Sequence, residues 1–193
     1  MKRLIALFTV LAAASALSAE TYTIDPVHSS VGFSLRHLVS KFTGNFTKTT
    51  GTLIYDAAAP EKSSVVATVE IASVNSGNDT RNGHLTDSEH NFFDVAKFPT
   101  ASFKSTAWKK TGADTFDVTG DLTIKGVTKP VVLKTTLLGT GPGMGGSTVI
   151  GWEAVTTINK ADFGVSGPAM LGKALGDTVT LTIGIEAGYK PAK

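Results

Sequence analysis

The stretch TFDVTGDLTIKGVTKPVVLKTTLL, residues 115–138, decides the fold. An apolar residue or a glycine stands at every second position from Phe116 to Ile124, which is the pattern of a β-strand with one buried face. Lys125-Gly126 then supplies a tight turn, and residues 128–138 form a second run rich in apolar and β-branched residues. The stretch therefore predicts an antiparallel β-hairpin.

The same period-two pattern recurs on both sides of this hairpin. In HSSVGFSLRH, residues 28–37, the side chains of Val31, Phe33 and Leu35 share one face. Because turns join most consecutive strands, the strands are expected to pair antiparallel in an all-β domain, either a barrel or a sandwich. We predict a short leading strand at residues 21–25 and eight further strands at residues 28–37, 44–55, 65–74, 100–108, 115–124, 128–138, 147–158 and 177–187.

Two stretches interrupt this pattern. In SVNSGNDTRNGHLTDSEHNFFDVAKFPTASFKS, residues 73–105, we predict a short helix over Asp79–Leu85 with Asn78 or Asp79 as its N-cap. Residues 159–173 are also irregular. We expect the first stretch to form a lid and a side wall for a cavity inside the strands.

The first nineteen residues have the organisation of a secretory signal peptide. Lys2 and Arg3 precede an uncharged apolar run from Leu4 to Leu17, which is shorter than the about 20 residues that span a bilayer. We therefore predict a signal peptide at residues 1–19, a single domain at residues 20–193, and a periplasmic location without stable membrane insertion. Removal of the signal peptide changes the net charge from +2 to 0.

Composition excludes several classes of function. The chain has no cysteine, so a thiol nucleophile, a cysteine metal site, a disulfide and a lipid anchor on cysteine are all excluded. No basic cluster with interleaved aromatic residues occurs, and we expect no binding to nucleic acid. The sequence leaves a homodimer of two barrels open.

The histidines offer weak evidence for metal binding or catalysis. His28, His37, His84 and His90 do not have the spacing of a known metal motif, and the alternative is that they cap turns or bond strand ends. Ser166 in GVSG only superficially resembles a nucleophile elbow. We therefore predict no metal, no cofactor and no catalytic residue.

Two other motifs are better explained as a turn and a solvated strand face than as a nucleotide-binding or catalytic site. The glycines at positions 141, 143 and 146 match GxGxxG, but a strand follows them and not the helix that a dinucleotide loop requires. The carboxylates Asp117 and Asp121 lie opposite the apolar face of their strand, where a solvated surface explains them. Both motifs are assigned to the barrel exterior or its turns.

Large apolar side chains are spread over many of the predicted strands. An eight-stranded barrel has an interior that side chains just fill or that holds one ligand. The residues alone therefore leave a packed core and a ligand cavity equally open.

Several blocks of the chain resemble a known family. HSSVGFSLRH at residues 28–37 resembles an HSxVxFxxxH pattern, and GDLTIKGVTKPV at residues 120–131 is the most specific block. Further matches follow in the same order at Gly44-Asn45-Phe46, Gly51, Ser73-Val74, Arg81, His84-Leu85, Phe92-Phe93-Asp94, Pro99, Phe103, Ser105, Asp162-Phe163-Gly164 and Gly176-Asp177-Thr178-Val179. These blocks are similar to the YceI-like family of polyisoprenoid-binding periplasmic proteins.

The resemblance implies an eight-stranded antiparallel lipocalin-like barrel with irregular lid segments. Its apolar tunnel would hold a long-chain isoprenoid lipid, such as a polyprenyl phosphate or a quinone tail, without enzymatic activity. Each buried methylene contributes about 0.8 kcal/mol, so an apolar sleeve suffices for a long chain. The expected ligand-binding residues are Phe33, Leu35, His37, Phe46, His84, Phe92, Phe93, Phe103, Leu122, Trp152, Phe163, Met170, Leu171 and Leu181.

Within this set the strand residues would line the barrel, and His37 or His84 would meet a polar head group. The segment Thr86–Asn91 is longer than the family's usual spacing and carries no arginine or lysine, and Asn82 stands where an aspartate is common. We expect the chain to differ from its relatives there in what it binds. Two alternatives remain open: a hydrolase or isomerase that uses His84 or His37 as a base, and a packed barrel that serves as an interaction module.

Overall fold

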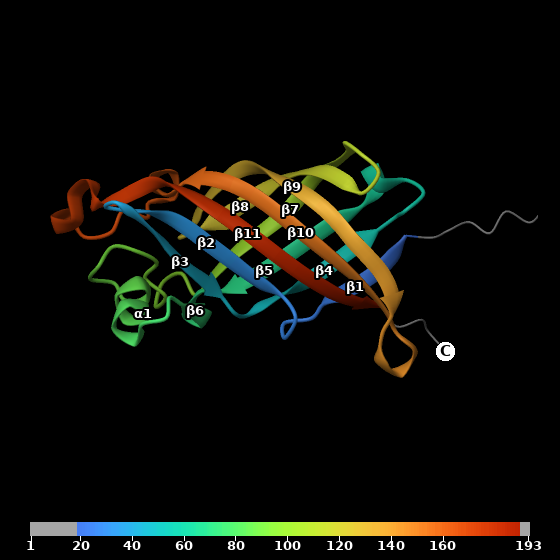
Figure 1. Ribbon diagram of the computed structural model, residues 1–193, viewed down its shortest axis with the longest axis horizontal. Helices are drawn as coiled ribbons and strands as arrows, with labels where there is room; N and C mark the ends of the chain where they lie inside the picture. Colours follow the sequence, from blue (N-terminus) through green and yellow to red (C-terminus); the bar gives the residue numbers. More distant parts are fainter. Residues whose placement is uncertain (1–18, 190–193) are drawn as a thin grey trace, which may run out of the picture.

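The computed structural model describes residues 19–189, so the predicted signal peptide lies outside the described residues except for Ala19. One sheet of strands makes up most of the described chain (Figure 1). No helix within residues 19–189 is long and apolar enough to cross a membrane. The strands are β1 (Glu20–Ile24), β2 (Ser30–His37), β3 (Ser40–Phe46), β4 (Thr49–Tyr55), β5 (Ser64–Glu70), β6 (Val74–Asn75), β7 (Thr100–Lys110), β8 (Thr115–Ile124), β9 (Val127–Pro142), β10 (Thr148–Asn159) and β11 (Leu175–Tyr189).

The sheet closes into an eight-stranded antiparallel barrel, as predicted. Its ring runs β1-β4-β5-β7-β8-β9-β10-β11, and β1 pairs with β11 to complete it. Strands β2, β3 and β6 continue the wall toward the end of the barrel that carries the helix α1 (Asp79–Thr86) (Figure 1). The short 3-10 helices are η1 (Pro60–Lys62), η2 (Ile71–Ser73), η3 (Met144–Gly146), η4 (Lys160–Phe163) and η5 (Ala169–Ala174).

Two predicted strands are wrong in detail because the wall bends. Residues 44–55 were expected to form one strand, but β3 and β4 are separate and β3 begins at Ser40. Residues 65–74 divide in the same way into β5, η2 and β6. At the bend, the amide of Thr47 donates to the carbonyl of Ser73 at 3.2 Å, and the amide of Glu70 donates to the carbonyl of Lys48 at 3.0 Å. Backbone groups at the bend that have no partner within the strands are thus hydrogen-bonded to each other across it.

The other local predictions are confirmed. Lys125 and Gly126 have φ values of 51° and 76°, the left-handed pair that a two-residue hairpin turn requires. The side chain of Asn78 accepts a hydrogen bond from the amide of Arg81 at 2.9 Å and caps α1. Three strands run further than expected: β7 extends to Lys110, β9 extends to Pro142, and β11 spans Leu175–Tyr189.

The barrel interior is packed at one end and hollow at the other. The packed end holds a cluster in which the rings of Trp108 and Trp152 meet edge to face at 5.6 Å, with Phe116 and Tyr55 against them. A smaller cluster of Phe46, Ile71, Val74 and Leu85 lies under α1. The candidate site lies in the space between the lid segments and this second cluster.

Candidate ligand-binding cavity

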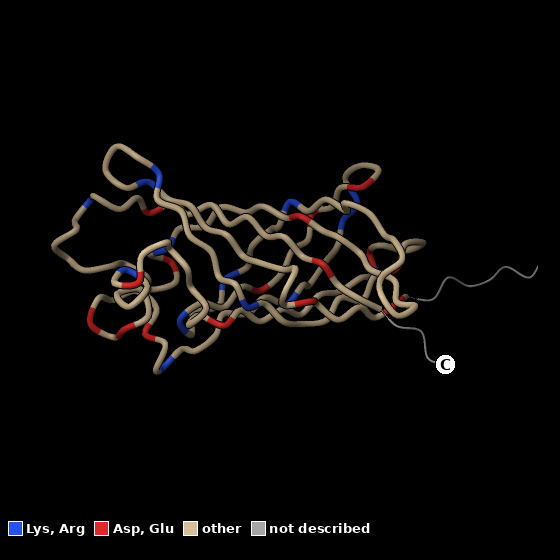
Figure 2. Tube along the Cα trace, turned by 60° about the horizontal axis from the view of Figure 1, so that its bottom comes forward, with Lys and Arg blue, Asp and Glu red and all other residues tan. Residues whose placement is uncertain are grey.

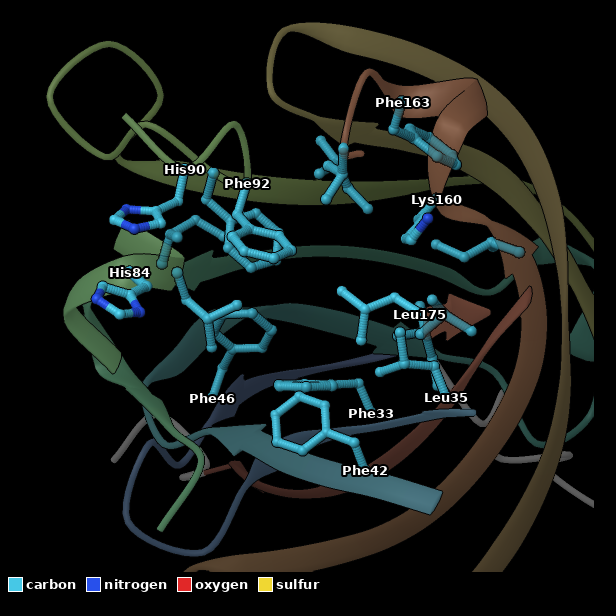
Figure 3. Close-up of a pocket in the computed structure, with 18 of the residues that line it drawn as sticks. Phe33, Leu35, Phe42, Phe46, His84, His90, Phe92, Lys160, Phe163 and Leu175 are labelled. Atoms are coloured by element: carbon cyan, nitrogen blue, oxygen red, sulfur yellow. The ribbon is translucent and has the colours of Figure 1, made fainter. Parts of the chain in front are cut away.

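A cavity of about 630 Å³ opens inside the helix-bearing end of the barrel. Strands β2, β3, β8 and β11 contribute to its wall, and α1, the segment around Phe92, η4 and η5 close around it (Figure 3). Its volume falls in the range of about 300–1,000 Å³ that small-molecule sites occupy. The interior of this barrel is therefore a ligand-sized space at one end and a packed core at the other.

Nearly all of the predicted site residues line this cavity. The exceptions are Phe103 and Trp152, which line a second cavity of about 130 Å³ deeper in the barrel. Leu122 and Leu181 line both cavities. The residues that line the first cavity are Phe33, Leu35, His37, Phe46, His84, Leu122, Phe92, Phe93, Phe163, Met170, Leu171 and Leu181. Their placement agrees with the predicted tunnel, and their contact with a ligand remains a prediction.

Phenylalanines form a continuous patch on the cavity wall. The ring of Phe33 lies 5.7 Å from that of Phe42 and 5.5 Å from that of Phe46. The ring of Phe46 packs edge to face against Phe93 at 5.6 Å. The patch therefore connects β2 and β3 to the lid segment (Figure 3). Alternation along β2 pointed to Phe33, whereas Phe42 was missed because β3 was expected to begin after it.

The lid segment is fastened to the loop that follows η4. The ammonium of Lys125 donates to Asn91 Oδ1 at 3.0 Å and to the carbonyl of Gly164 at 3.1 Å. The amide of Gly167 donates to the carbonyl of Asn91 at 3.2 Å. A Cβ on Gly167 would lie 2.8 Å from Phe92 Cζ, so the glycine admits the ring. The lid and the loop thus close over the cavity together.

The segment Thr86–Asn91, where the spacing is unusual, shapes one side of the cavity. It places His90 so that its ring stacks on that of His84, with centroids 4.0 Å apart. His90 Nδ1 lies 2.6 Å from Asp87 Oδ2. A hydrogen bond from the amide of His90 and the contact with its ring lower the pKa of the Asp87 carboxyl. Both histidines line the cavity beside its apolar surface (Figure 3).

The ionisable side chains of the cavity wall are basic. The lining residues include Lys41, Arg81 and Lys160, and no aspartate or glutamate is among them within the described chain. The guanidinium of Arg81 donates to the carbonyl of Ser76 at 2.6 Å and lies 4.8 Å from the centre of the Phe42 ring. The sequence blocks matched Arg81 but did not indicate that its side chain reaches the cavity.

Lys160 is the most buried of these cations, with 8% of its surface exposed. Its ammonium donates to Asp177 Oδ1 at 2.9 Å, and this contact lowers the pKa of the exposed Asp177 carboxyl. Lys160 follows the last residue of β10 and points toward the cavity (Figure 3). No pattern in the sequence singled it out, because a lysine after a strand is usually solvated.

The site contains no serine positioned against an imidazole within the described residues. The hydroxyl of Ser166 is bonded to Asn91 Nδ2 at 2.5 Å and to the carbonyl of Gly167 at 3.1 Å. A separate group of Asp25, His28 and Glu186 brings its potential ligand atoms within 4.8 Å of one another. His28 Nδ1 is already bonded to Asp25 Oδ2 at 2.9 Å, and this bond lowers the pKa of Asp25 and raises that of His28. Asp25 and His28 lie in the segment between β1 and β2, Glu186 lies in β11, and none of the three lines the cavity.

Comparison with known proteins identifies the family. Residues 22–187 match the family described as the YceI-like domain. The chain belongs to the YceI-like family. It is 41% identical over 179 residues to a UPF0312 protein of Pseudomonas syringae pv. tomato, which covers 91% of this chain and 92% of the relative. A UPF0312 protein of Pseudomonas fluorescens is also 41% identical, over 185 residues, with 94% and 93% covered.

Several solved structures share the fold. A YceI protein of Campylobacter jejuni superposes with a TM-score of 0.69 at 28% identity and covers 97% of this chain and 100% of its own. BcnA of Burkholderia cenocepacia gives a TM-score of 0.76 at 24% identity, with 84% and 98% covered. A protein of Saccharophagus degradans described as a polyisoprenoid binding domain gives 0.66 at 18% identity, with 88% and 98% covered. The last two likenesses concern the fold alone.

Proposed function

We propose that the protein binds one long-chain isoprenoid, or a similar amphiphilic lipid, and carries or sequesters it in the periplasm without catalysing a reaction. The observation that carries this proposal is the cavity of about 630 Å³ with its wall of phenylalanine and aliphatic side chains. An apolar chain gains free energy from every methylene that leaves water, so this wall provides affinity without a reactive group. The description of the Saccharophagus relative as a polyisoprenoid binding domain supports the same ligand class.

The interior offers a path for a chain longer than the first cavity. Five residues line both cavities, so the two spaces are neighbours along the barrel. These side chains are of small or medium size, and rotamer changes in the valines and leucines would join the two cavities. They are Val31, Val69, Ala101, Leu122 and Leu181.

The basic side chains of the wall favour an amphiphile with an anionic head group, such as a polyprenyl phosphate. Lys41, Arg81 and Lys160 line the cavity with no carboxylate among the lining residues of the described chain. A phosphate accepts charge-assisted hydrogen bonds from such donors, whereas the apolar chain lies against the phenylalanines.

The test combines the identification of lipids that co-purify with the native protein and a variant in which a larger side chain blocks the cavity. Protein purified from its native host is extracted and its lipids are identified by mass spectrometry, and uptake of a prenyl phosphate by delipidated protein is measured by fluorescence competition. Ala101→Phe puts a ring where the two cavities meet and is expected to lower the affinity for a long-chain prenyl phosphate at least about tenfold.

The matched control is Ala107→Phe, the same change at an exposed position of β7. It is expected to bind like the wild type, and circular dichroism verifies that both variants fold. Native protein without any co-purifying lipid, together with delipidated protein that takes up no prenyl ligand, would refute the proposal.

A further inference from the structure

Two exposed tips stand side by side at the end of the barrel that holds the cavity. One is the turn between β2 and β3, and the other is η5, which ends where β11 begins (Figure 1). The amide of Leu38 donates to the carbonyl of Ala174 at 2.7 Å and ties the tips together. We call Leu38, Val39 and Met170, which these tips carry, the apolar tip.

The apolar tip is exposed to an unusual degree. The exposed fraction is 54% for Leu38, 101% for Val39 and 90% for Met170. Single exposed apolar residues are ordinary on a protein surface, but here three large ones gather on two adjoining turns.

The backbone of the turn makes this choice of residues costly. Leu38 has φ of 50°, in the left-handed region that favours glycine or asparagine. The equivalent first position of the turn between β8 and β9 is Lys125, which has the same conformation with φ of 51° but carries a side chain that suits solvent. The β2–β3 turn therefore holds a leucine where both the backbone and the solvent disfavour it. A partner that buries the leucine would offset both costs.

The charged side chains in the two segments that form the apolar tip are basic (Figure 2). Residues 36–41 and 168–175 contain Arg36, Lys41 and Lys173, and they contain no aspartate or glutamate. Arg36 Nε donates to the carbonyl of Leu38 at 2.7 Å, which holds this cation at the turn. The nearby Asp177 is bonded to Lys160 at 2.9 Å. The tip therefore presents apolar side chains within a basic rim.

We propose that the apolar tip docks the protein on a lipid bilayer with anionic head groups, so that the mouth of the cavity faces the lipid. Protruding apolar side chains that enter the interface beside cations are the general means by which proteins bind such a surface peripherally. Three side chains are too few for a stable protein interface, which buries about 800 Å² on each partner. Lys41, Met170 and Leu171 also line the cavity, so the docking surface is continuous with it.

Vesicle binding tests this docking without reference to a bound ligand. Co-sedimentation is measured with mixed phosphatidylethanolamine–phosphatidylglycerol vesicles and with phosphatidylcholine vesicles, at low and high salt. We expect binding to the anionic vesicles that falls with salt, and a loss of at least about tenfold in Val39→Asp and in Met170→Asp.

The chain supplies a control for each variant. Met144 is 95% exposed in η3, at the opposite end of the barrel, and Val27 is 82% exposed between β1 and β2 (Figure 1). Met144→Asp and Val27→Asp change the net charge equally and are expected to bind vesicles like the wild type. Leu38→Asn is expected to raise the midpoint of chemical denaturation and still weaken vesicle binding.

Three results would overturn the proposal: wild-type protein that does not sediment with anionic vesicles, control variants that lose binding as much as the tip variants, or a tip that mediates self-association. The last is read from analytical ultracentrifugation, in which Val39→Asp would dissociate a dimer. Uptake of a prenyl phosphate from solution is measured in parallel. Because Val39 does not line the cavity, Val39→Asp should keep this uptake, and so a failure of docking is distinguished from a failure of ligand binding.

Discussion

Lys160 illustrates at the scale of one residue how the cavity departs from an ordinary barrel core. Its side chain is 8% exposed among apolar neighbours, and its bonded partner Asp177 lies largely in solvent. Desolvation of a cation can cost more than its attraction to one exposed carboxylate returns. The anionic ligand that we propose would give this ammonium a second partner beside Asp177, which would account for a lysine at the cavity wall.

Replacement of Lys160 should show separately how much the charge of the head group and the apolar chain contribute to the affinity for a ligand. Lys160→Met keeps the length of the side chain and removes its charge, so we expect the affinity for a prenyl phosphate to fall about tenfold or more and that for the corresponding prenol to stay within about twofold. Competition binding with both ligands measures this. The control is Lys134→Met, which removes an exposed lysine bonded to Asp117 at 2.8 Å on the outer surface. Equal losses for phosphate and alcohol would contradict the assigned role.

Tyr22 provides a test of the packed end of the barrel through the pH dependence of the free energy of unfolding. Burial, followed by the hydrogen bond that its hydroxyl donates to Glu20 Oε2 at 2.9 Å, raises the pKa of Tyr22 from 10.0 to about 12. Since the folded pKa is the higher one, the stabilisation is complete below pH 10 and is lost as the pH rises from 10 to 12. The free energy of unfolding should fall by about 2–3 kcal/mol more in the wild type than in Tyr22→Phe over this range. Chemical denaturation measures it, and parallel curves for the two proteins would refute the assignment.

The alternating pattern predicted residues of the barrel interior well and residues of the lid poorly. Phe33 and Leu35 follow from the period of β2, because a strand sends every second side chain inward. Lys160 and Arg81 belong to a 3-10 helix and to α1, where no such period applies. Their direction depends on contacts with distant segments, such as that between Lys160 and Asp177, which no local pattern encodes.

At the scale of elements, close approach between neighbouring strands explains why some strand positions carry glycine. A Cβ on Gly120 in β8 would lie 2.4 Å from Phe103 Cζ and 2.6 Å from the carbonyl oxygen of Lys104 in β7. The ring of Phe103 therefore lies over the glycine and fills space that a side chain would otherwise occupy. This contact fixes the ring that lines the deeper cavity.

Gly120→Ala is therefore expected to destabilise the barrel by about 1–3 kcal/mol through overpacking. Gly141 in β9 is the matched control, because a Cβ there would meet nothing within 4 Å. Gly141→Ala should change the free energy of unfolding by less than about 0.5 kcal/mol. Chemical denaturation of both variants gives the comparison, and equal effects would show that the close approach does not limit the strand pairing.

The bends at Thr47–Lys48 and at η2 show what strand propensity does not encode. Residues 44–55 and 65–74 are rich in β-branched and aromatic residues, so the sequence predicts two continuous strands. The break arises from tertiary pairing, since Ser73 Oγ accepts hydrogen bonds from the amides of Thr47 and Lys48 at 3.1 Å each. These contacts let β3 and β6 form the wall of the hollow end, so the cavity depends on a feature that only the folded chain reveals.

The division of the whole molecule into a packed end and a hollow end sets an upper limit on ligand length. Affinity should rise by about fourfold for each methylene that enters the apolar interior, because each contributes about 0.8 kcal/mol. The rise should stop when the cavity of about 630 Å³ is full, unless the side chains between the cavities give way. A prenyl phosphate series from geranyl through farnesyl to longer chains locates this plateau by competition binding.

Ala101→Phe distinguishes a closed cavity from a tunnel in the same series. Because Ala101 lines both cavities, a ring there should move the plateau to a shorter chain and leave the affinity of the shortest ligand nearly unchanged. Ala107→Phe, on the outside of β7, should keep the wild-type plateau. An affinity that is independent of chain length in all three proteins would mean that the chain stays outside the barrel, and the cavity would then bind only the head group.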